Sequence, residues 1–584
     1  MAKMTSIYIG VSGLNSAQTA LNTTTHNLAN VYTPGYTRQL SFTADKTYNT
    51  IGQSYTSAMQ VGLGVSMVET SRVRDILLDK SYRTENGRQG FYEAEYEVAL
   101  EIQTIIGETE GVRFQQTLED VWTSINEMAK TPDSTVSRSE LVMNAELFID
   151  RAKNIYTELI DYQKNIDTKI VNIVNKINSL GDEINALNLK ISGIEAPNIE
   201  DANDLRDRRD LLLDELSGMV KINYNEDENS YVSVMVEGVP FITDGGVFHM
   251  GIQELDGDKG SVYSTCVWPY LDNQEVFHLE EPITTDNKND IGNIKGYLLA
   301  RGDFVGSYTD VPEVSDYDVS TPEGYNEYME AVATYNKTVE CCSIVKTQAL
   351  FDKLIHNVVT AINDVLSPTT SEVPAGVTQY TDANGNVYNA SDVKILDMTT
   401  STGNDGKMPP EELFSRKYTE RYIEVTGDDG NTYYMFNNTN TLDDESLYTL
   451  NNIEMNQVIL EDYSKLPFKT KQQDNDLAKG EELVALWGKQ GMTLDPNNMS
   501  RYTFKQFYAQ LVYVIGNEGD LHNSIASNQK IARDQIDDRR TEITGVSSED
   551  ELTNMIKYQS AYNAASRYVT TIADMLQYVI EKLG

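Results

Sequence analysis

The sequence contains few cysteines, an excess of acidic over basic residues, and no long apolar run. Its 584 residues include three cysteines, two of them adjacent at Cys341 and Cys342, so a disulfide framework is excluded and stability has to come from packing. The 47 basic and 89 acidic side chains give a net charge of −42, which disfavours nucleic acid as a partner because such a surface repels phosphate. No segment approaches the roughly 18 apolar residues of a membrane-spanning helix, which indicates no membrane insertion.

The first residues of the chain also lack the pattern of a secretory signal. Met1 to Leu21 contains one lysine and no continuous apolar stretch followed by a small-residue cleavage site. By default this absence indicates a cytoplasmic protein. It leaves open specialised export systems that use an uncleaved N-terminus.

The residue clusters of most catalytic and metal sites are missing as well. The histidines are scattered without the spacing of metal ligands, and there is neither a zincin motif nor a CxxC pair. Gly62-Leu63-Gly64 lacks the third glycine of a dinucleotide site, so a turn is the better interpretation. We therefore expect no enzyme, no cofactor and no metal site. The five histidines are His26, His249, His278, His356 and His522.

The most regular apolar patterns lie at the two ends of the chain. Both follow alternating steps of three and four residues, the heptad pattern of a helix with a narrow apolar stripe. Such a stripe cannot be buried by a lone helix, and the economical partner for each end is the other end. The alternative is that each end packs on its nearest domain. The expected core and assembly residues are Val11, Leu14, Leu21 and Leu28 at the N-terminal end, and Leu552, Met555, Tyr562, Val569, Leu576 and Ile580 at the C-terminal end.

The N-terminal helix carries further information about its partner. Gly10 and Gly13 each cost up to about 1 kcal/mol of helix propensity, which close approach of another helix would justify. Pro34 disfavours helix at the residue before it, so the helix should end there. In an antiparallel or steeply crossed pair within one subunit, we expect Leu14, Leu21 and Leu28 to pack against Leu576, Val569 and Tyr562 or their near neighbours.

Further helical segments lie between the ends. An isoleucine-rich heptad seam runs from Ile170 to Ile194, and a stutter at Ile166 separates it from an earlier stripe. The segment 203–216 predicts a charged helix with Asp204/Arg208 and Arg206/Asp210 pairs at i,i+4. Pairs of this kind usually lie on a solvated face.

Strand patterns appear in the middle of the sequence. Alternating valines from Val232 to Val236 predict a strand, and a helical segment is expected at 325–366. Residues 367–456 are rich in Thr, Asn, Asp, Gly and Tyr, with hairpin turns at Asn384-Gly385 and within 422–435. Helical patterning returns at Glu481 and continues to the end.

These patterns predict a mainly helical α+β fold with a nested organisation. We expect three parts: a paired coiled-coil terminal core, a long-helix body with a small β part, and an inserted β-rich outer domain. The core takes 1–45 and 541–584, the body 46–366 and 457–540, and the insert 367–456.

The ends also carry motifs of a known family. Residues 13–22, 27–30 and 33–39 resemble the N-terminal signature of the bacterial flagellar rod/hook axial protein superfamily, and Pro-Gly-Tyr-Thr-Arg-Gln is similar to the version in its hook–filament junction family. His26 stands where that family usually has Ser or Asn. Segments 62–65, 72–75, 204–216, 296–303, 545–552 and 557–564 are similar to further family segments in the same order. The motif residues are Asn27, Asn30, Pro34, Gly35, Tyr36 and Arg38.

The resemblance implies a structural role in the flagellum. It implies export through the flagellar type III apparatus, with an uncleaved N-terminus and a cytoplasmic export chaperone, to the extracellular hook–filament junction. The implied partners are copies of the same chain in a ring or helical assembly, the hook protein on the proximal side and hook-associated protein 3 on the distal side.

Two other functions compete with this one. A flagellar hook or distal rod protein would share the ends but fits Pro34-Gly35-Tyr36 and the long isoleucine-rich helices less well. A surface hydrolase carried in the insert would need a cluster of His, Cys or carboxylate side chains, and residues 367–456 contain neither His nor Cys.

Overall fold

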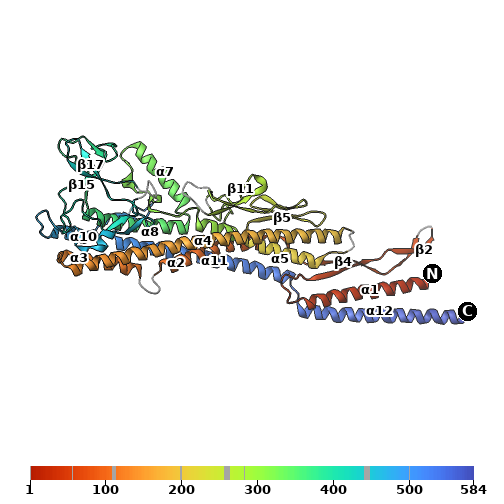
Figure 1. Ribbon diagram of the computed structural model, residues 1–584. Helices are drawn as coiled ribbons and strands as arrows, with labels where there is room; N and C mark the ends of the chain where they lie inside the picture. Colours follow the sequence, from red (N-terminus) through yellow and green to blue (C-terminus); the bar gives the residue numbers. More distant parts are fainter. Residues whose placement is uncertain are drawn as a thin grey trace.

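The computed structural model is an elongated molecule in which both chain ends lie at the same end (Figure 1). Helices form most of it, accompanied by several small antiparallel sheets, so the predicted mainly helical α+β fold is confirmed. None of the helices in the described residues is long and apolar enough to cross a membrane. The structure describes residues 2–54, 57–107, 113–196, 200–255, 263–281, 283–439, 447–498 and 500–583.

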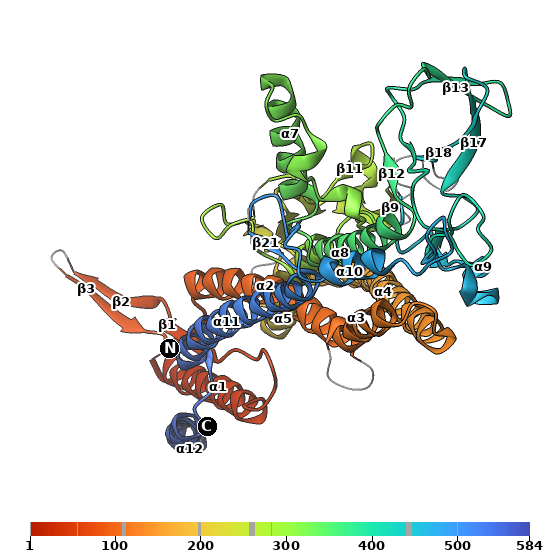
Figure 2. The same ribbon diagram turned by 90° about the vertical axis from the view of Figure 1, so that its left-hand side faces the viewer.

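The terminal end consists of two antiparallel helices and a pair of β-ribbons. Helices α1 (Ala2–Ala29) and α12 (Ser548–Leu583) run side by side in opposite directions (Figure 1). Strand β1 (Gln39–Asp45) pairs with β4 (Val65–Arg72), and β2 (Tyr48–Ser54) pairs with β3 (Ser57–Gly62) in an arm that projects from the core (Figure 2). The sequence patterns did not predict these strands.

The expected boundary between core and body at residue 45 falls inside this β structure. Asp45 pairs with Val65 in the β1–β4 ladder, and the Thr23 hydroxyl of α1 lies 2.7 Å from the Ser41 hydroxyl of β1. The ladder continues to Arg72, and the Val65 amide of β4 donates to the Ser12 hydroxyl of α1 at 3.2 Å, so β1 and β4 both contact the N-terminal helix.

Long helices form the body. The predicted isoleucine-rich seam lies in α4 (Thr135–Glu195), a single helix of 61 residues whose buried positions include Ile166, Ile170, Ile177, Leu180 and Ile184. The stutter at Ile166 does not interrupt it, because the helix remains buried along both stripes. The other body helices are α2 (Ile76–Ile106), α3 (Phe114–Lys130), α5 (Asn203–Met219), α6 (Asn293–Arg301), α7 (Pro322–Thr338), α8 (Ser343–Leu366), α9 (Gln457–Glu461), α10 (Leu477–Leu486) and α11 (Phe504–Thr544).

Two small sheets pack on the middle of α4. In the first, the predicted alternation appears as β6, in which Val232, Val234 and Val236 are buried. A Cβ at Gly181 of α4 would lie 2.5 Å from the ring of Phe241, so the sheet approaches the helix closely there. The strands are β5 (Ile222–Glu226), β6 (Val232–Val236), β7 (Val239–Thr243) and β8 (Gly246–Val247), followed by β9 (Gly251–Glu254), β10 (Ser264–Trp268) and β11 (Gln274–Glu275).

The outer sheet contains both predicted hairpins. Its turns lie at Gly385 and Gly430, and its own small core is built around Tyr380, Val425 and Met435. It projects from the long helices of the body on the same side as α7 (Figures 1 and 2). The sheet order is β12 (Thr369–Thr370), β15 (Ile395–Leu396), β18 (Thr432–Phe436), β17 (Tyr422–Gly427), β13 (Gln379–Asp382) and β14 (Val387–Asn389).

Part of the predicted insert belongs to the core of the body. Strands β16 (Phe414–Arg416) and β19 (Ile453–Met455) pair with each other, and Phe414 and Ile453 are buried in the main hydrophobic core. Residues 440–446 of the predicted insert lie outside the described residues. A two-stranded sheet, β20 (Met492–Thr493) and β21 (Arg501–Tyr502), precedes α11.

Candidate functional site: the terminal helix pair and its joint to the body

The contact face of α1 consists of small and polar residues. Its buried positions follow three-and-four spacing, but they lie one residue before the leucines of the predicted stripe. Leu14, Leu21 and Leu28 are half-buried. A stripe of small residues does not appear as hydrophobic periodicity. In the sequence, only Gly10 and Gly13 indicated this stripe. The buried residues of α1 are Gly10, Ala17, Ala20, Thr24 and Asn27.

On α12 the predicted stripe divides into two groups. Met555, Tyr562, Val569 and Leu576 are half-buried, while Leu552 and Ile580 are 47% and 70% exposed. On α1 the predicted Val11 is 38% exposed. Within one chain, these three side chains therefore contribute little to the helix pair and remain available on its surface.

The register of the pair differs from the expected one. A Cβ placed on Gly10 would lie 2.7 Å from Cγ2 of Val569, and one on Gly13 would lie 3.9 Å from Cβ of Ala565. Leu14 therefore lies level with the turn around Ala565 and not with Leu576. The expected pairing of Leu14, Leu21 and Leu28 with Leu576, Val569 and Tyr562 is wrong by about three helical turns, although the antiparallel direction is as predicted.

Asn27 organises the chain that leaves α1. Its side chain is 1% exposed; its amide donates to the Gln39 carbonyl at 2.9 Å, and its oxygen accepts from the Gln39 amide at 3.0 Å. The Tyr36 hydroxyl donates to the same oxygen at 2.8 Å, and its own oxygen lies 3.0 Å from Nδ1 of His26. Burial and the nearby carboxylates of Asp204 and Asp207 raise the pKa of Tyr36, so it remains a hydroxyl donor.

The turn after α1 uses the other motif residues. The helix ends at Ala29, and the Asn30 amide donates to the His26 carbonyl at 3.0 Å. Pro34 lies in the exposed turn, and Gly35 has φ +76°, a left-handed conformation that suits glycine. A Cβ on Gly35 would lie 3.3 Å from Cβ of Leu211, so this turn packs against the body helix α5.

Arg38 connects this turn to the other end of the chain. Its backbone amide donates to the Thr544 carbonyl at the end of α11, at 2.8 Å. Its Nε donates to Glu551 Oε1 of α12, also at 2.8 Å, and the Glu551 side chain is 2% exposed. One residue thus fixes the α11–α12 connection relative to the N-terminal turn.

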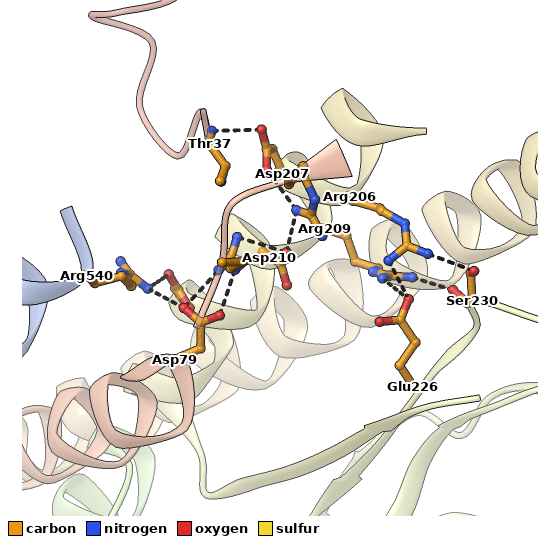
Figure 3. Close-up of polar contacts among 12 residues, drawn as sticks. Thr37, Asp79, Arg206, Asp207, Arg209, Asp210, Glu226, Ser230 and Arg540 are labelled. Carbon is orange, nitrogen blue, oxygen red and sulfur yellow. Dashed lines mark hydrogen bonds and ion pairs between the residues drawn. The ribbon is translucent and has the colours of Figure 1, made fainter. Parts of the chain in front are cut away.

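Helix α5 supplies buried carboxylates to the joint, by which we mean the contact region between terminal core and body (Figure 3). Asp207 accepts from the Thr37 amide at 2.9 Å and from Arg72 at 2.8 Å. Asp210 lies 2.8 Å from Arg72, 2.9 Å from Arg74 and 3.3 Å from Arg83. Burial alone would raise the pKa of Asp210, but Arg74, Arg72 and Arg83 outweigh it and hold that pKa far below its ordinary value.

Asp214 extends the joint to α11. It accepts from Nε of Arg83 at 2.7 Å and from Arg540 at 2.6 Å. The Arg540 guanidinium also lies 3.9 Å from the ring centroid of Tyr82 on α2. The ends of α2, α5 and α11 are therefore tied together by charged groups.

A second group of ion pairs connects α5 to the end of α4 and to the neighbouring sheet (Figure 3). Arg206 lies 2.6 Å from Glu195 at the end of α4 and donates to the Ser230 hydroxyl at 2.7 Å. The buried Arg209 lies 2.8 Å from Glu226. Although burial opposes ionisation, hydrogen bonds led by that of Arg206 lower the pKa of Glu195 to about 2.

The interpretation of the 203–216 helix as a solvated charged face is therefore wrong. Asp204 accepts from the Gln39 side chain at 2.9 Å, and Arg206 and Asp210 pair with other elements. The Asp204 and Arg208 side chains do remain largely exposed, at 63% and 55%, and Arg208 pairs weakly with Glu183. Sequence spacing cannot distinguish local i,i+4 pairs from long-range pairs made by the same residues.

The arrangement at the joint consists of mechanical contacts. In the part of the chain that the structure describes, no group of three or more His, Cys, Asp or Glu side chains is placed to hold a metal ion. What the geometry provides is an antiparallel helix pair with exposed apolar side chains, held at a set angle to the body by buried ion pairs.

Comparison with known proteins gives three family matches along the chain. Residues 99–317 match the flagellar hook-associated protein FlgK helical domain. Residues 7–37 match the flagella basal body rod protein family, and residues 539–582 match the flagellar basal body rod FlgEFG protein C-terminal family.

The chain also has relatives that match over nearly its whole length. Flagellar hook-associated protein 1 of Bacillus subtilis (strain 168) is 25% identical over 100% of this chain and 99% of the relative. The protein of the same name from Salmonella typhimurium is 23% identical over 96% of each chain. The chain is similar to flagellar hook-associated protein 1 along its whole length. Together with the rod and hook family matches, this supports a flagellar axial protein of the hook-junction type.

A solved structure has a similar fold. The flagellar hook junction protein FlgK from Burkholderia pseudomallei aligns with a TM-score of 0.51 at 10% identity, covering 80% of this chain and 100% of that one. The two rod-family matches lie at the ends of the chain, and the match to the FlgK helical domain lies between them.

Proposed function

We propose that the protein joins the distal end of the hook to the filament as an assembly of identical copies. In this proposal the hook protein lies on the proximal side and hook-associated protein 3 on the distal side. The chain reaches the extracellular junction through the flagellar type III apparatus, assisted by a cytoplasmic chaperone, and has no enzymatic activity. It binds no nucleic acid and does not insert into the membrane.

The exposed apolar side chains of the terminal pair carry this proposal. Val11, Leu552, Ile556 and Ile580 are 38%, 47%, 66% and 70% exposed in the single chain. Burying such surface against neighbouring copies contributes about 25 cal/mol per Å². The predicted assembly residues therefore act in two groups: Met555, Tyr562, Val569 and Leu576 hold the pair together, and the exposed group contacts other subunits.

The distribution of charge favours association at this end. Residues 1–40 contain Lys3 and Arg38 and no acidic residue, although the chain as a whole carries −42. Repulsion between copies therefore originates mainly in the body and outer domain, where it is screened over about 8 Å at physiological salt.

We keep the three-part division as a proposal, with two changes. The terminal unit takes 1–72 and 541–584, because the β1–β4 ladder and the Thr23–Ser41 contact support assigning these strands to it. The outer module is the six-stranded sheet between Thr369 and Phe436, while β16 and β19 go with the body.

Electron microscopy of flagella from a strain lacking the gene tests the proposal. Such cells should carry hooks without filaments, and the wild-type chain should restore the filaments. A hook or distal rod protein, the alternative function, would leave cells without hooks.

A pair of variants tests the assembly surface directly. Ile580→Asp should abolish filament formation while the purified chain keeps its helix content, because it places a charge on an apolar contact. Thr553→Asp adds the same charge at an exposed polar position of the same helix and should leave filaments intact. Normal filaments with Ile580→Asp would refute the assignment of this surface.

A further inference from the structure

Two adjacent cysteines share the wall of a cavity on the body. Cys341 and Cys342 connect α7 to α8, and their Sγ atoms lie 3.5 Å apart. Both line a cavity of about 350 Å³ together with Phe277, Leu279 and Leu298. Cys341 is half-buried and Cys342 is 7% exposed, so one thiol is accessible and the other forms the inner wall.

The backbone around the pair is closely fitted. Cys342 is the residue that precedes the first turn of α8, a helix of 24 residues whose positive end favours negative charge there. Gly302 has φ +69°, and a Cβ on it would lie 2.4 Å from Val345 and 3.2 Å from Cβ of Cys342. Any other residue at 302 would push against the inner cysteine.

The two thiols differ in acidity. The hydrogen bond between them lowers the pKa of Cys341, whereas that hydrogen bond and burial raise the pKa of Cys342. Cys341, the accessible thiol, is therefore the first to ionise and to react. The third cysteine, Cys266, is fully buried, and burial raises its pKa to about 12.

The geometry disfavours a disulfide between these thiols. Adjacent Cα atoms are about 3.8 Å apart, which is shorter than the 4.4 Å or more that an unstrained disulfide requires. A single atom bonded to both sulfurs fits better. With bonds of about 2.3 Å to each sulfur, the 3.5 Å separation corresponds to an S–X–S angle of roughly 100°. That angle suits a pyramidal trivalent centre, whereas a linear two-coordinate metal ion would need the sulfurs farther apart.

We propose that Cys341 and Cys342 form a vicinal dithiol site that binds monosubstituted trivalent arsenic compounds, with the organic substituent in the adjoining cavity. Phe277, Leu279 and Leu298 supply apolar contacts for an aryl group. Carboxylates of Glu275, Glu280 and Asp303 also line the cavity, so a neutral arsenical is favoured over an anion.

The reaction needs no oxidant. Two S–H bonds and the As=O bond of an arsine oxide break, two As–S bonds form, and the oxygen leaves with both protons as one water molecule. Arsenic stays trivalent throughout. Both sulfurs belong to one chain, so a competing monothiol releases the arsenic only after both As–S bonds are broken. A small dithiol can form both replacement bonds itself.

Intact-mass spectrometry of the full-length chain with phenylarsine oxide tests this site. One equivalent should add one arsenical per chain, which survives a thousandfold excess of 2-mercaptoethanol and is removed by 2,3-dimercaptopropanol. Cys341→Ser changes the half-exposed thiol and should fold normally, yet it should lose the monothiol-resistant adduct completely. Cys266→Ser should retain it.

Two results would overturn the proposal. One is loss of the wild-type adduct to 2-mercaptoethanol as readily as from Cys341→Ser. The other is a resistant adduct that persists in both Cys341→Ser and Cys342→Ser. A circular-dichroism melt of each variant distinguishes loss of the site from loss of the fold.

Discussion

The same substitution at two neighbouring glycines of α1 should have opposite effects on the terminal pair. Gly10→Ala and Gly13→Ala each add one methyl group to the helix, three residues apart. In the structure, the new Cβ would lie 2.7 Å from Cγ2 of Val569 at position 10, but 3.9 Å from Cβ of Ala565 at position 13. The first distance is about 1 Å shorter than an ordinary carbon–carbon contact, and the second is ordinary.

Two opposing contributions determine how each substitution changes the stability of the terminal pair. Alanine stabilises a helix by about 1 kcal/mol relative to glycine, and both variants gain this. At position 10 the helices have to separate or Val569 has to leave its rotamer, which is stiff because valine is branched at Cβ. Overpacking of this kind costs about 1–3 kcal/mol. We therefore expect Gly13→Ala to stabilise the pair by up to about 1 kcal/mol, and Gly10→Ala to be neutral or to destabilise it by up to about 2 kcal/mol.

Amide hydrogen exchange in α1 and α12 of the purified chain measures this difference. Protection in α1 should rise up to about fivefold with Gly13→Ala and should fall with Gly10→Ala, since 1.4 kcal/mol corresponds to about tenfold in an equilibrium constant. Exchange in α4, which contacts neither glycine, serves as the internal control. Equal increases in protection for both variants would refute the close approach at Gly10, and with it the register of the pair.

Three further predictions concern the joint and the outer sheet. Asn27→Ala should expose residues 31–46 to limited proteolysis and cost about 1–3 kcal/mol, because it leaves backbone groups of Gln39 unpaired; Asn30→Ala, a partly exposed control, should not. The pKa of Glu195 is lowered on folding, so its contribution to stability is complete above its unfolded pKa of about 4.3 and is lost as pH falls towards 2. Glu195→Gln should therefore lower the urea midpoint at pH 7, by an amount that shrinks towards pH 2. Replacing 379–389 by a Gly/Ser linker should preserve motility on swarm plates, whereas excising all of 367–456 should destabilise the body because it removes β16 and β19.

The sequence was sufficient to predict that the ends pair, but not how they meet. Heptad spacing identifies a helix that needs a partner, and this holds for both α1 and α12. The register depends on which face gives the closest approach, and on α1 that approach is at Gly10, where an added Cβ would lie 2.7 Å from Val569. Small residues carry no hydrophobic signal, so the leucines one position away dominated the pattern.

The joint could not be predicted because its partners are distant in the sequence. The acids of α5 are visible in the sequence, and Arg72 and Arg74 stand in segment 72–75, which resembles a family segment. Nothing in the spacing indicates that Asp210 lies between three arginines from β4, the turn after it, and α2. Strands β1 and β4 were not predicted for a different reason: between them only Gln39 is buried, so they lack the buried alternation that identifies a strand.

The charged contacts of the joint suit a protein in which every copy holds its terminal helix pair at the same angle to the body. Apolar packing tolerates sliding and rotation, whereas an arginine–carboxylate pair is directional. Arg72 of β4 pairs with both Asp207 and Asp210 of α5, and Thr37 and Gln39 donate to Asp207 and Asp204, so moving the terminal unit would break several of these contacts together. Replacing such pairs by apolar residues often leaves stability unchanged, so stability alone does not explain them. A fixed angle between core and body does explain them under the proposed assembly: copies that contact one another through exposed side chains such as Leu552 and Ile580 would fit together only if each holds its helices in the same direction.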